Sequence, residues 1–260
     1  MIIAGSSLLY SRLSFPRACQ NLSELGFTAV DIAVIEGWAH FDPSAVGNHI
    51  EATANEITNA CEDAGVQPVA FNAGTDTDTV GMEIEQIRSL AALAEEIGIE
   101  VITLQGGRSE DDIETDFDRF RHLVEAIDSF DVTLTVETHW GTHLEDPSIA
   151  AKYPENVPGL YLTIDPGHFA IGPHWDDGYG MLLEDVAHVH LRQAGDGWEN
   201  VQVSPNDGKI DFEELLTGLE KTGYEDVVSV EYIDSLDGVD AEDAEVWATR
   251  MREVIEATLD

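Results

Sequence analysis

Residues 132–137 read V-T-L-T-V-E, a short apolar run that ends in a potential metal ligand, Glu137. Three later runs have the same form: residues 160–165 (L-Y-L-T-I-D), 186–190 (V-A-H-V-H) and 227–231 (V-V-S-V-E). Short apolar runs rich in β-branched residues predict buried strands. A potential ligand therefore closes each of four consecutive expected strands: Glu137, Asp165, His190 and Glu231.

The alternation of strand, loop and helix is expected eight times along the chain. Strands are predicted at residues 2–7, 29–34, 67–71, 101–104, 132–137, 161–165, 188–191 and 227–232. Helices are predicted at residues 15–26, 45–64, 82–97, 111–130, 212–222 and 241–258, with short ones near 148–152 and 180–184. Strands that alternate with amphipathic helices indicate a parallel sheet. The length of 260 residues is close to that of one barrel, ~250 residues. We predict an α/β fold, a single-domain (β/α)8 TIM barrel over residues 1–260, because the glycine-rich turn of a dinucleotide-binding sheet is missing after the first strand.

Side-chain parity indicates what the barrel interior contains, because successive side chains of a strand face opposite ways. In residues 132–137, Leu134 and Val136 face the helices, whereas Thr135 and Glu137 face inward. The same alternation along the other strands predicts that Asp165, His190 and Glu231 also face inward. It predicts inward side chains for three polar residues near the ends of earlier strands as well: Asp31, Asn72 and Gln105. Active sites of this fold lie at the carboxyl ends of the strands. Seven inward polar groups at that end exceed what a packed barrel top requires.

Three carboxylates and one imidazole suit a hard or borderline divalent cation. We expect Mn²⁺ first, with Mg²⁺, Co²⁺, Fe²⁺ or Zn²⁺ as alternatives. Such a metal can polarise adjacent carbonyl and hydroxyl oxygens and stabilise an enediolate. Glu137 and Glu231, which come from separate strands, can then remove and return a proton. The pattern predicts an isomerase or epimerase of a hydroxy-carbonyl compound.

Several motifs resemble the xylose isomerase-like TIM barrel superfamily of sugar (phosphate) isomerases and epimerases. They are V-E-T-H (136–139), I-D-P-G-H (164–168), H-V-H-L-R-Q (188–193), G-K-I-D-F-E-E-L-L (208–216) and G-Y-E-D-V-V-S-V-E-Y (223–232). The resemblance implies that Glu137, Asp165, His190 and Glu231 bind the metal, that the two glutamates are the acid and base, and that His168 contacts a substrate hydroxyl. It also implies a sugar, sugar phosphate or sugar acid as substrate, and a homodimer or homotetramer.

The chain departs from this family pattern after the H-x-H motif of the strand expected at residues 188–191. Many relatives read H-x-H-x-K-D, whereas here Arg192 and Gln193 follow His190-Leu191, so Gln193 replaces the Asp. An Arg found slightly further on in ketose 3-epimerases is also absent, with Asp196 near its place. These differences argue against a simple ketose 3-epimerase.

Four further residues are candidates for binding substrate: His40, Arg108, Arg192 and Lys209. The three cations fall in loops at the expected active face, where they could bind a substrate carboxylate or phosphate. Local pairing with the abundant acids is the alternative for them. His40 could close over the substrate or cap a helix.

Three other functions remain compatible with the sequence. An inosose-type dehydratase would use the same metal and base but expel hydroxide. An apurinic endonuclease would need a three-metal cluster that the spare histidines do not clearly complete. A non-catalytic barrel that binds metal or sugar is the third.

The charge of the chain is extreme: 52 Asp and Glu against 12 Lys and Arg give a net charge of −40. Such a surface argues against nucleic acid and anionic membranes as partners. The N-terminal segment lacks a basic region, and no apolar run approaches the ~20 residues of a membrane span, so we expect a cytoplasmic protein. Because salt screens repulsion between like charges, we also expect a halophilic-type protein.

Removing salt tests the last expectation. Lowering KCl from about 1 M to about 0.1 M lengthens the Debye length from ~3 Å to ~10 Å, so repulsion should lower the thermal unfolding midpoint. Circular dichroism during reversible unfolding measures this midpoint. Stability that is unchanged or improved without salt would contradict the halophilic interpretation.

Overall fold

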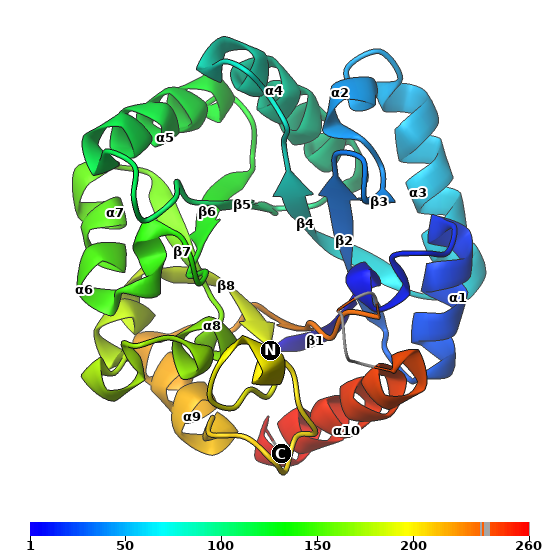
Figure 1. Cartoon of the computed structure of the whole chain (residues 1–260). Coiled ribbons are helices and arrows are strands. Elements are labelled where there is room, and N and C mark those ends of the chain that lie inside the picture. The colour runs from blue at the N-terminus through cyan, green and yellow to red at the C-terminus, as the bar shows by residue number, and fades with distance from the viewer. Residues whose placement is uncertain (235, 237–239, 260) are drawn as a thin grey trace.

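The computed structural model describes residues 1–234, 236 and 240–259, and a closed barrel of eight parallel strands forms its centre (Figure 1). The strands are β1 (Ile2–Ser6), β2 (Ala29–Ile35), β4 (Gln67–Gly74), β5 (Val101–Gln105), β6 (Thr133–Glu137), β7 (Leu160–Ile164), β8 (Val186–Leu191) and β9 (Val227–Val230). They pair in chain order, and parallel pairing of β1 with both β2 and β9 closes the barrel. A short strand, β3 (Ala39–His40), adds to β2 antiparallel.

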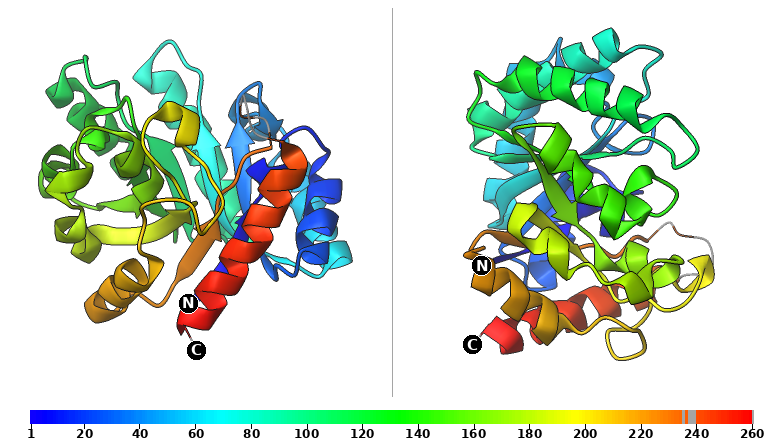
Figure 2. Two further views of the ribbon diagram at one scale, coloured as in Figure 1. Left: turned by 60° about the horizontal axis from the view of Figure 1, so that its bottom comes forward. Right: turned by 90° about the vertical axis from the view of Figure 1, so that its left-hand side faces the viewer.

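Helices surround the barrel and cover its outer face (Figure 1). The longer ones are α1 (Phe15–Glu24), α3 (Ile50–Ala64), α4 (Val80–Ile97), α5 (Ile113–Ile127), α9 (Phe212–Thr222) and α10 (Ala241–Leu259). The shorter ones are α2 (Pro43–Val46), α6 (Pro147–Ala150), α7 (Lys152–Asn156) and α8 (Pro166–Ile171). Both chain ends lie at one end of the barrel, opposite the long loop between β8 and α9 (Figure 2). Among the described helices, none has the length and apolar character needed to cross a membrane.

The barrel interior confirms the parity argument. Three inward threonines, Thr103, Thr135 and Thr163, form a triangle of hydrogen bonds with hydroxyl separations of 2.6–3.0 Å. All three are buried, whereas Leu134 and Val136 belong to the core between the barrel and its helices. The polar residues therefore share the inner face of the strands, below the carboxyl ends.

Several element boundaries differ from the sequence-based expectation. The single helix expected at residues 45–64 is two helices, α2 and α3, because the chain turns at Gly47. A Cβ at Gly47 would lie 2.8 Å from the Ser89 hydroxyl on α4, so the turn allows close packing there. Two short helices, α6 and α7, cover the region expected near 148–152, and residues 180–185 form a 3₁₀ helix. The short elements β3 and α8 were not expected.

Gln193 organises the loop between β8 and α9. Its side-chain amide donates to the carbonyls of Pro205 and Ile210, and its side-chain oxygen accepts from the backbone of Ile210. Gly208 packs directly on this amide, since a Cβ there would lie 2.3 Å from the Gln193 side-chain oxygen and 2.4 Å from the carbonyl of Ala194. The residue that departs from the family pattern therefore has a structural role in this chain.

Substitution of Gly208 tests that packing. We expect Gly208→Ala to destabilise the fold by about 1–3 kcal/mol, because the backbone of Ala194 cannot move aside without strain. Gly180→Ala is the control, because a Cβ at Gly180 meets no atom within 4 Å. Denaturant unfolding measures both variants, and equal stability of the two would contradict the packing argument.

Candidate metal centre

The four predicted ligands come together inside the carboxyl end of the barrel. Glu137 is the last residue of β6, Asp165 follows β7 as the N-cap of α8, His190 lies in β8, and Glu231 follows β9. Their exposed fractions are only 0–3%. Closure of the barrel therefore places three carboxylates and an imidazole, from distant parts of the sequence, in one buried region.

His190 is the centre of this group. Its Nδ1 lies 2.6 Å from Glu137 Oε1 and 3.4 Å from Glu231 Oε1. Asn72, on β4, donates a hydrogen bond to the same Glu231 oxygen at 2.8 Å. The ligating atoms of Glu137, His190 and Glu231 all lie within 4.8 Å of one another, so three of the four predicted ligands already form a compact donor set.

Asp165 faces the same region but is engaged differently. Its Oδ1 accepts a hydrogen bond from the backbone of Gly167 at 2.8 Å, which caps α8. Its Oδ2 lies 2.9 Å from a terminal nitrogen of Arg192. The other terminal nitrogen of Arg192 donates to Glu231 Oε2 at 2.6 Å. A guanidinium thus lies between two of the predicted ligands, an arrangement that the sequence pattern did not reveal.

A second layer of polar residues supports His190 from inside the barrel. Asp31 Oδ2 lies 3.3 Å from His190 Nε2 and accepts hydrogen bonds from His188 Nε2 at 2.8 Å and the Ser229 hydroxyl at 2.7 Å. A carboxylate on Nε2 favours a proton there and leaves the Nδ1 lone pair for a cation. Asp31 therefore orients His190 toward Glu137 and Glu231.

Burial and neighbouring charges shift the pKa values of these groups in opposite directions. Burial raises the pKa of Glu231 to about 7, against the influence of His190 and Arg192. Burial also opposes the charge on Glu137, but His190 outweighs it and lowers the pKa of that glutamate. The pKa of His190 is raised well above its usual value, because the nearby carboxylates outweigh burial. Without a cation, His190 therefore carries positive charge into the carboxylate group.

The chemistry of the donor set fits a divalent cation. One oxygen of the set, Asp165 Oδ2, is buried and accepts no hydrogen bond from the described residues, although Arg192 lies 2.9 Å away as an ion-pair partner. Buried carboxylates need positive charge nearby, and oxygen ligands with one imidazole are the donors that Mn²⁺ and Mg²⁺ accept. Glu137, Asp165, His190 and Glu231 are thus the residues that could hold such an ion.

The remaining candidates for substrate binding lie in different surroundings. His168, on α8, is buried against the His139 ring at a centroid distance of 3.7 Å, and its Nε2 accepts from Arg192 at 2.6 Å. Burial, with the neighbouring His139 and Arg192, lowers the pKa of His168 well below its usual value, so the ring is neutral. Arg108 lines the pocket beside the metal ligands, with 78% of its side chain exposed.

The structure does not bring His40 and Lys209 into that pocket. His40 Nε2 lies 3.0 Å from the carbonyl of Ser7, and its ring packs edge-on against Phe15. Lys209 pairs with Asp196 and lies over the ring of Trp175 at 5.8 Å, beside a different pocket. Arg192 is buried, and its donors bind protein groups, so direct contact with a substrate is not supported for it either.

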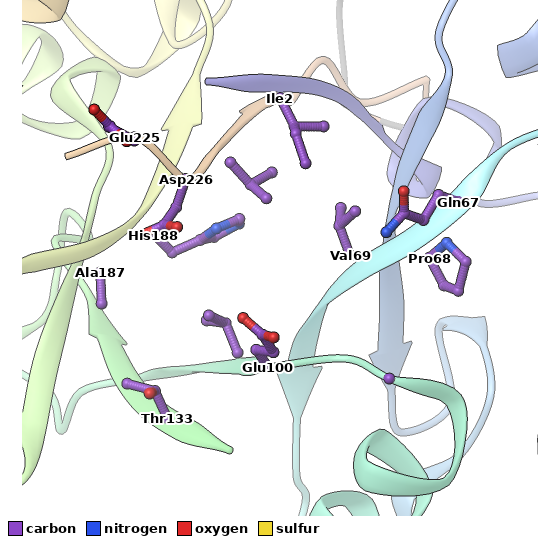
Figure 3. Close-up of a pocket in the computed structure, with 13 residues that line it drawn as sticks. Ile2, Gln67, Pro68, Val69, Glu100, Thr133, Ala187, His188, Glu225 and Asp226 are labelled. Atoms are coloured by element: carbon purple, nitrogen blue, oxygen red, sulfur yellow. The ribbon is translucent and has the colours of Figure 1, made fainter. Parts of the chain in front are cut away.

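Two pockets lie at opposite ends of the barrel. One of about 600 Å³ opens over the ends of β4, β5 and β6, lined by Trp38, Asn72, Arg108, His139 and Trp140 among others. The other lies at the amino ends of the strands, with Glu100, His188 and Asp226 among the residues that line it (Figure 3). The first pocket includes Asn72, which contacts Glu231, so it is the one that reaches the candidate metal centre.

Asp31, Asn72 and His139 are site residues to which the sequence analysis assigned no role in binding or catalysis. Parity indicated that Asp31 and Asn72 face inward, and that signal was sufficient to place them near the ligands. It could not indicate their partners, because hydrogen bonds between strands depend on the register of the barrel. His139 lies beyond the end of β6, where parity no longer applies.

The fold and this cluster define a TIM barrel with an acidic and imidazole centre at its carboxyl end. The model of the Xylose isomerase-like TIM barrel family matches residues 19–256. The chain therefore belongs to this family. Among curated proteins, its sequence has no match.

Solved structures with similar folds extend over nearly the whole chain. A Xylose isomerase-like TIM barrel protein from Mycobacterium smegmatis in complex with magnesium has a TM-score of 0.79 at 14% identity, covering 100% of this chain and 98% of its own. D-allulose 3-epimerase from Methylomonas sp. has a TM-score of 0.76 at 14% identity, covering 99% and 98%. The probable 3-DHS dehydratase from Bacillus anthracis has a TM-score of 0.70 at 17% identity, covering 97% and 99%. At these identities the likeness establishes the fold.

Asp31 offers a test of the support given to His190. We expect Asp31→Asn to weaken Mn²⁺ binding about 10–100-fold, because loss of the carboxylate removes the group that orients the imidazole. Ser229→Ala removes a different hydrogen bond to Asp31 and should change affinity much less. Calorimetric titration measures both, and wild-type affinity in Asp31→Asn would exclude the supporting role.

Proposed function

We propose that the chain is a divalent-metal-dependent isomerase or epimerase of a sugar, sugar phosphate or sugar acid. One observation carries the proposal: two buried glutamates from separate strands, Glu137 and Glu231, converge on His190 Nδ1 at 2.6 and 3.4 Å. Two carboxylates at one centre can serve as base and acid for a single carbon. Similar folds in a D-allulose 3-epimerase and other family members support this class of reaction.

Glu137, Asp165, His190 and Glu231 are the proposed ligands, and Mn²⁺ is the proposed ion, with Mg²⁺, Co²⁺, Fe²⁺ or Zn²⁺ as alternatives. When bound, the ion supplies Lewis acidity that makes a C–H beside a carbonyl more acidic. The magnesium complex of a family member with the same fold supports a divalent cation in this barrel.

The glutamates would perform the proton transfer itself. One carboxylate takes the proton from the carbon beside the carbonyl, which leaves an enediolate, and the other returns a proton. Both oxygens of Glu231 are held, Oε1 by Asn72 and Oε2 by Arg192, so its orientation is set before substrate arrives. Preset orientation of the base is a general source of catalytic rate.

The pocket of about 600 Å³ beside Asn72 is the proposed substrate site. Its volume falls within the range of small-molecule sites, roughly 300–1,000 Å³. Trp38 and Trp140 expose 46% and 40% of their surface there and offer flat apolar faces to a sugar ring. Arg108 offers an exposed guanidinium to a substrate carboxylate or phosphate.

A dehydratase is the second candidate, because the fold of a probable 3-DHS dehydratase matches over 97% of this chain. The same glutamates would remove the proton, but a hydroxyl on the adjacent carbon would leave with a proton from the acid, releasing water. A metal- or sugar-binding barrel without turnover would use the same ligands and pocket.

Metal analysis followed by incubation with ketoses, sugar phosphates and sugar acids in deuterated water separates these functions. We expect one tightly bound divalent ion per chain, and deuterium exchange at a carbon beside a carbonyl without loss of water. Loss of water would identify a dehydratase. Metal binding without exchange on any substrate would favour a binding role, and a chain that binds no metal would contradict the proposal.

Replacement of one glutamate tests the assigned mechanism. We expect Glu231→Gln to lower turnover about 10²–10⁴-fold or more with the fold unchanged, because the amide cannot accept the proton. Glu62→Gln is a matched control, because Glu62 is an exposed residue near the carboxyl end of α3. Exchange kinetics and circular dichroism measure the two effects. An active Glu231→Gln variant would remove this residue from the mechanism.

A further inference from the structure

Arg192 is the most unusual residue of the candidate metal centre. It follows β8, is 2% exposed, and ranks among the largest fully buried side chains of the described residues. Its Nε donates to the carbonyl of Val201 at 3.1 Å. Its terminal nitrogens contact Glu231 Oε2 at 2.6 Å, Asp165 Oδ2 at 2.9 Å and His168 Nε2 at 2.6 Å. Every nitrogen of the guanidinium is therefore engaged by the protein.

These contacts place a permanent positive charge between two of the four proposed metal ligands. A guanidinium does not lose its proton in proteins, so this charge is present in every state of the site. Four buried carboxylates face this region, those of Asp31, Glu137, Asp165 and Glu231. Burying carboxylates without a countercharge is strongly unfavourable. Arg192 supplies part of that countercharge from within the chain.

The same charge opposes a dication. Arg192 binds Asp165 Oδ2 and Glu231 Oε2, oxygens that would otherwise be available to the ion. Like charges a few ångströms apart in a buried site repel strongly, even at the effective dielectric constant of ~20 typical of protein sites. A metal that binds here must draw these carboxylates partly away from Arg192 and tolerate its charge.

We propose that Arg192 is a built-in counter-cation, a positioning residue that holds Asp165 and Glu231 in place when the dication is absent and weakens its binding when it is present. This inference rests on the proposed metal centre. Arg192 would thus keep the apo site folded and set the metal affinity below what the four ligands alone would give. A direct substrate contact is not its role, because its donors are occupied inside the protein.

Charge-changing and charge-preserving substitutions distinguish this role from a purely structural one. Calorimetric titration of the metal-free protein with MnCl₂ is compared for wild type, Arg192→Met and Arg192→Lys. We expect Arg192→Met to bind Mn²⁺ about tenfold or more tightly than wild type, because a repelling charge is gone. Arg192→Lys keeps the charge and should bind with nearly wild-type affinity. In thermal unfolding, Mn²⁺ should raise the midpoint of Arg192→Met more than that of wild type.

The direction of the change decides the result. If Arg192 only held the ligands in place, its removal would weaken Mn²⁺ binding, so equal or weaker binding by Arg192→Met would overturn the inference. If Arg192→Met does not fold even with Mn²⁺, Arg192→Gln gives the same test, because it removes the charge but keeps an amide donor. If wild type binds Mn²⁺ but neither Arg192→Met nor Arg192→Gln binds it more tightly, the role proposed for Arg192 is overturned and the proposed function is not. Wild type that binds no metal overturns the proposed function as well.

Discussion

The compensation of buried negative charge is the constraint on which the interior of this barrel depends. Asp31, Glu137, Asp165 and Glu231 have exposed fractions of 0–3%, and each needs a positive or hydrogen-bonding partner. His190 and Arg192 supply those partners, with His188, Asn72 and Ser229 as donors. The proposed dication would complete this balance, so metal binding would also stabilise the carboxyl end of the barrel.

Much of the architecture could be predicted from local patterns. Apolar runs and helical periodicity gave the eight strands and the longer helices, because both signals depend only on nearby residues. Parity then turned Glu137, Asp165, His190 and Glu231 inward, and closure of the barrel does bring them together. The helix expected at residues 45–64 was wrong in its first turns, because the chain turns at Gly47 against Ser89 on α4. That contact is between elements and leaves no local signal.

The electrostatic partners of the site could not be predicted in the same way. Arg192 was expected in a loop at the active face, as a candidate for binding a substrate carboxylate or phosphate, yet its side chain is buried between Asp165 and Glu231. Asp31 was placed on the inner face, but its contact with His190 depends on the register around the whole barrel. Gln193, noted only as a departure from the family pattern, connects the loop from Ala194 to Ile210. These roles follow from contacts across the fold.

A crystal structure of the protein loaded with Mn²⁺, with anomalous scattering recorded, tests the central claim most directly. The account predicts one anomalous peak inside the carboxyl end of the barrel, with oxygens of Glu137, Asp165 and Glu231 and Nδ1 of His190 as its protein ligands. A peak elsewhere, or no peak at saturating Mn²⁺, would show that these side chains form a buried ion-pair network and do not hold a dication.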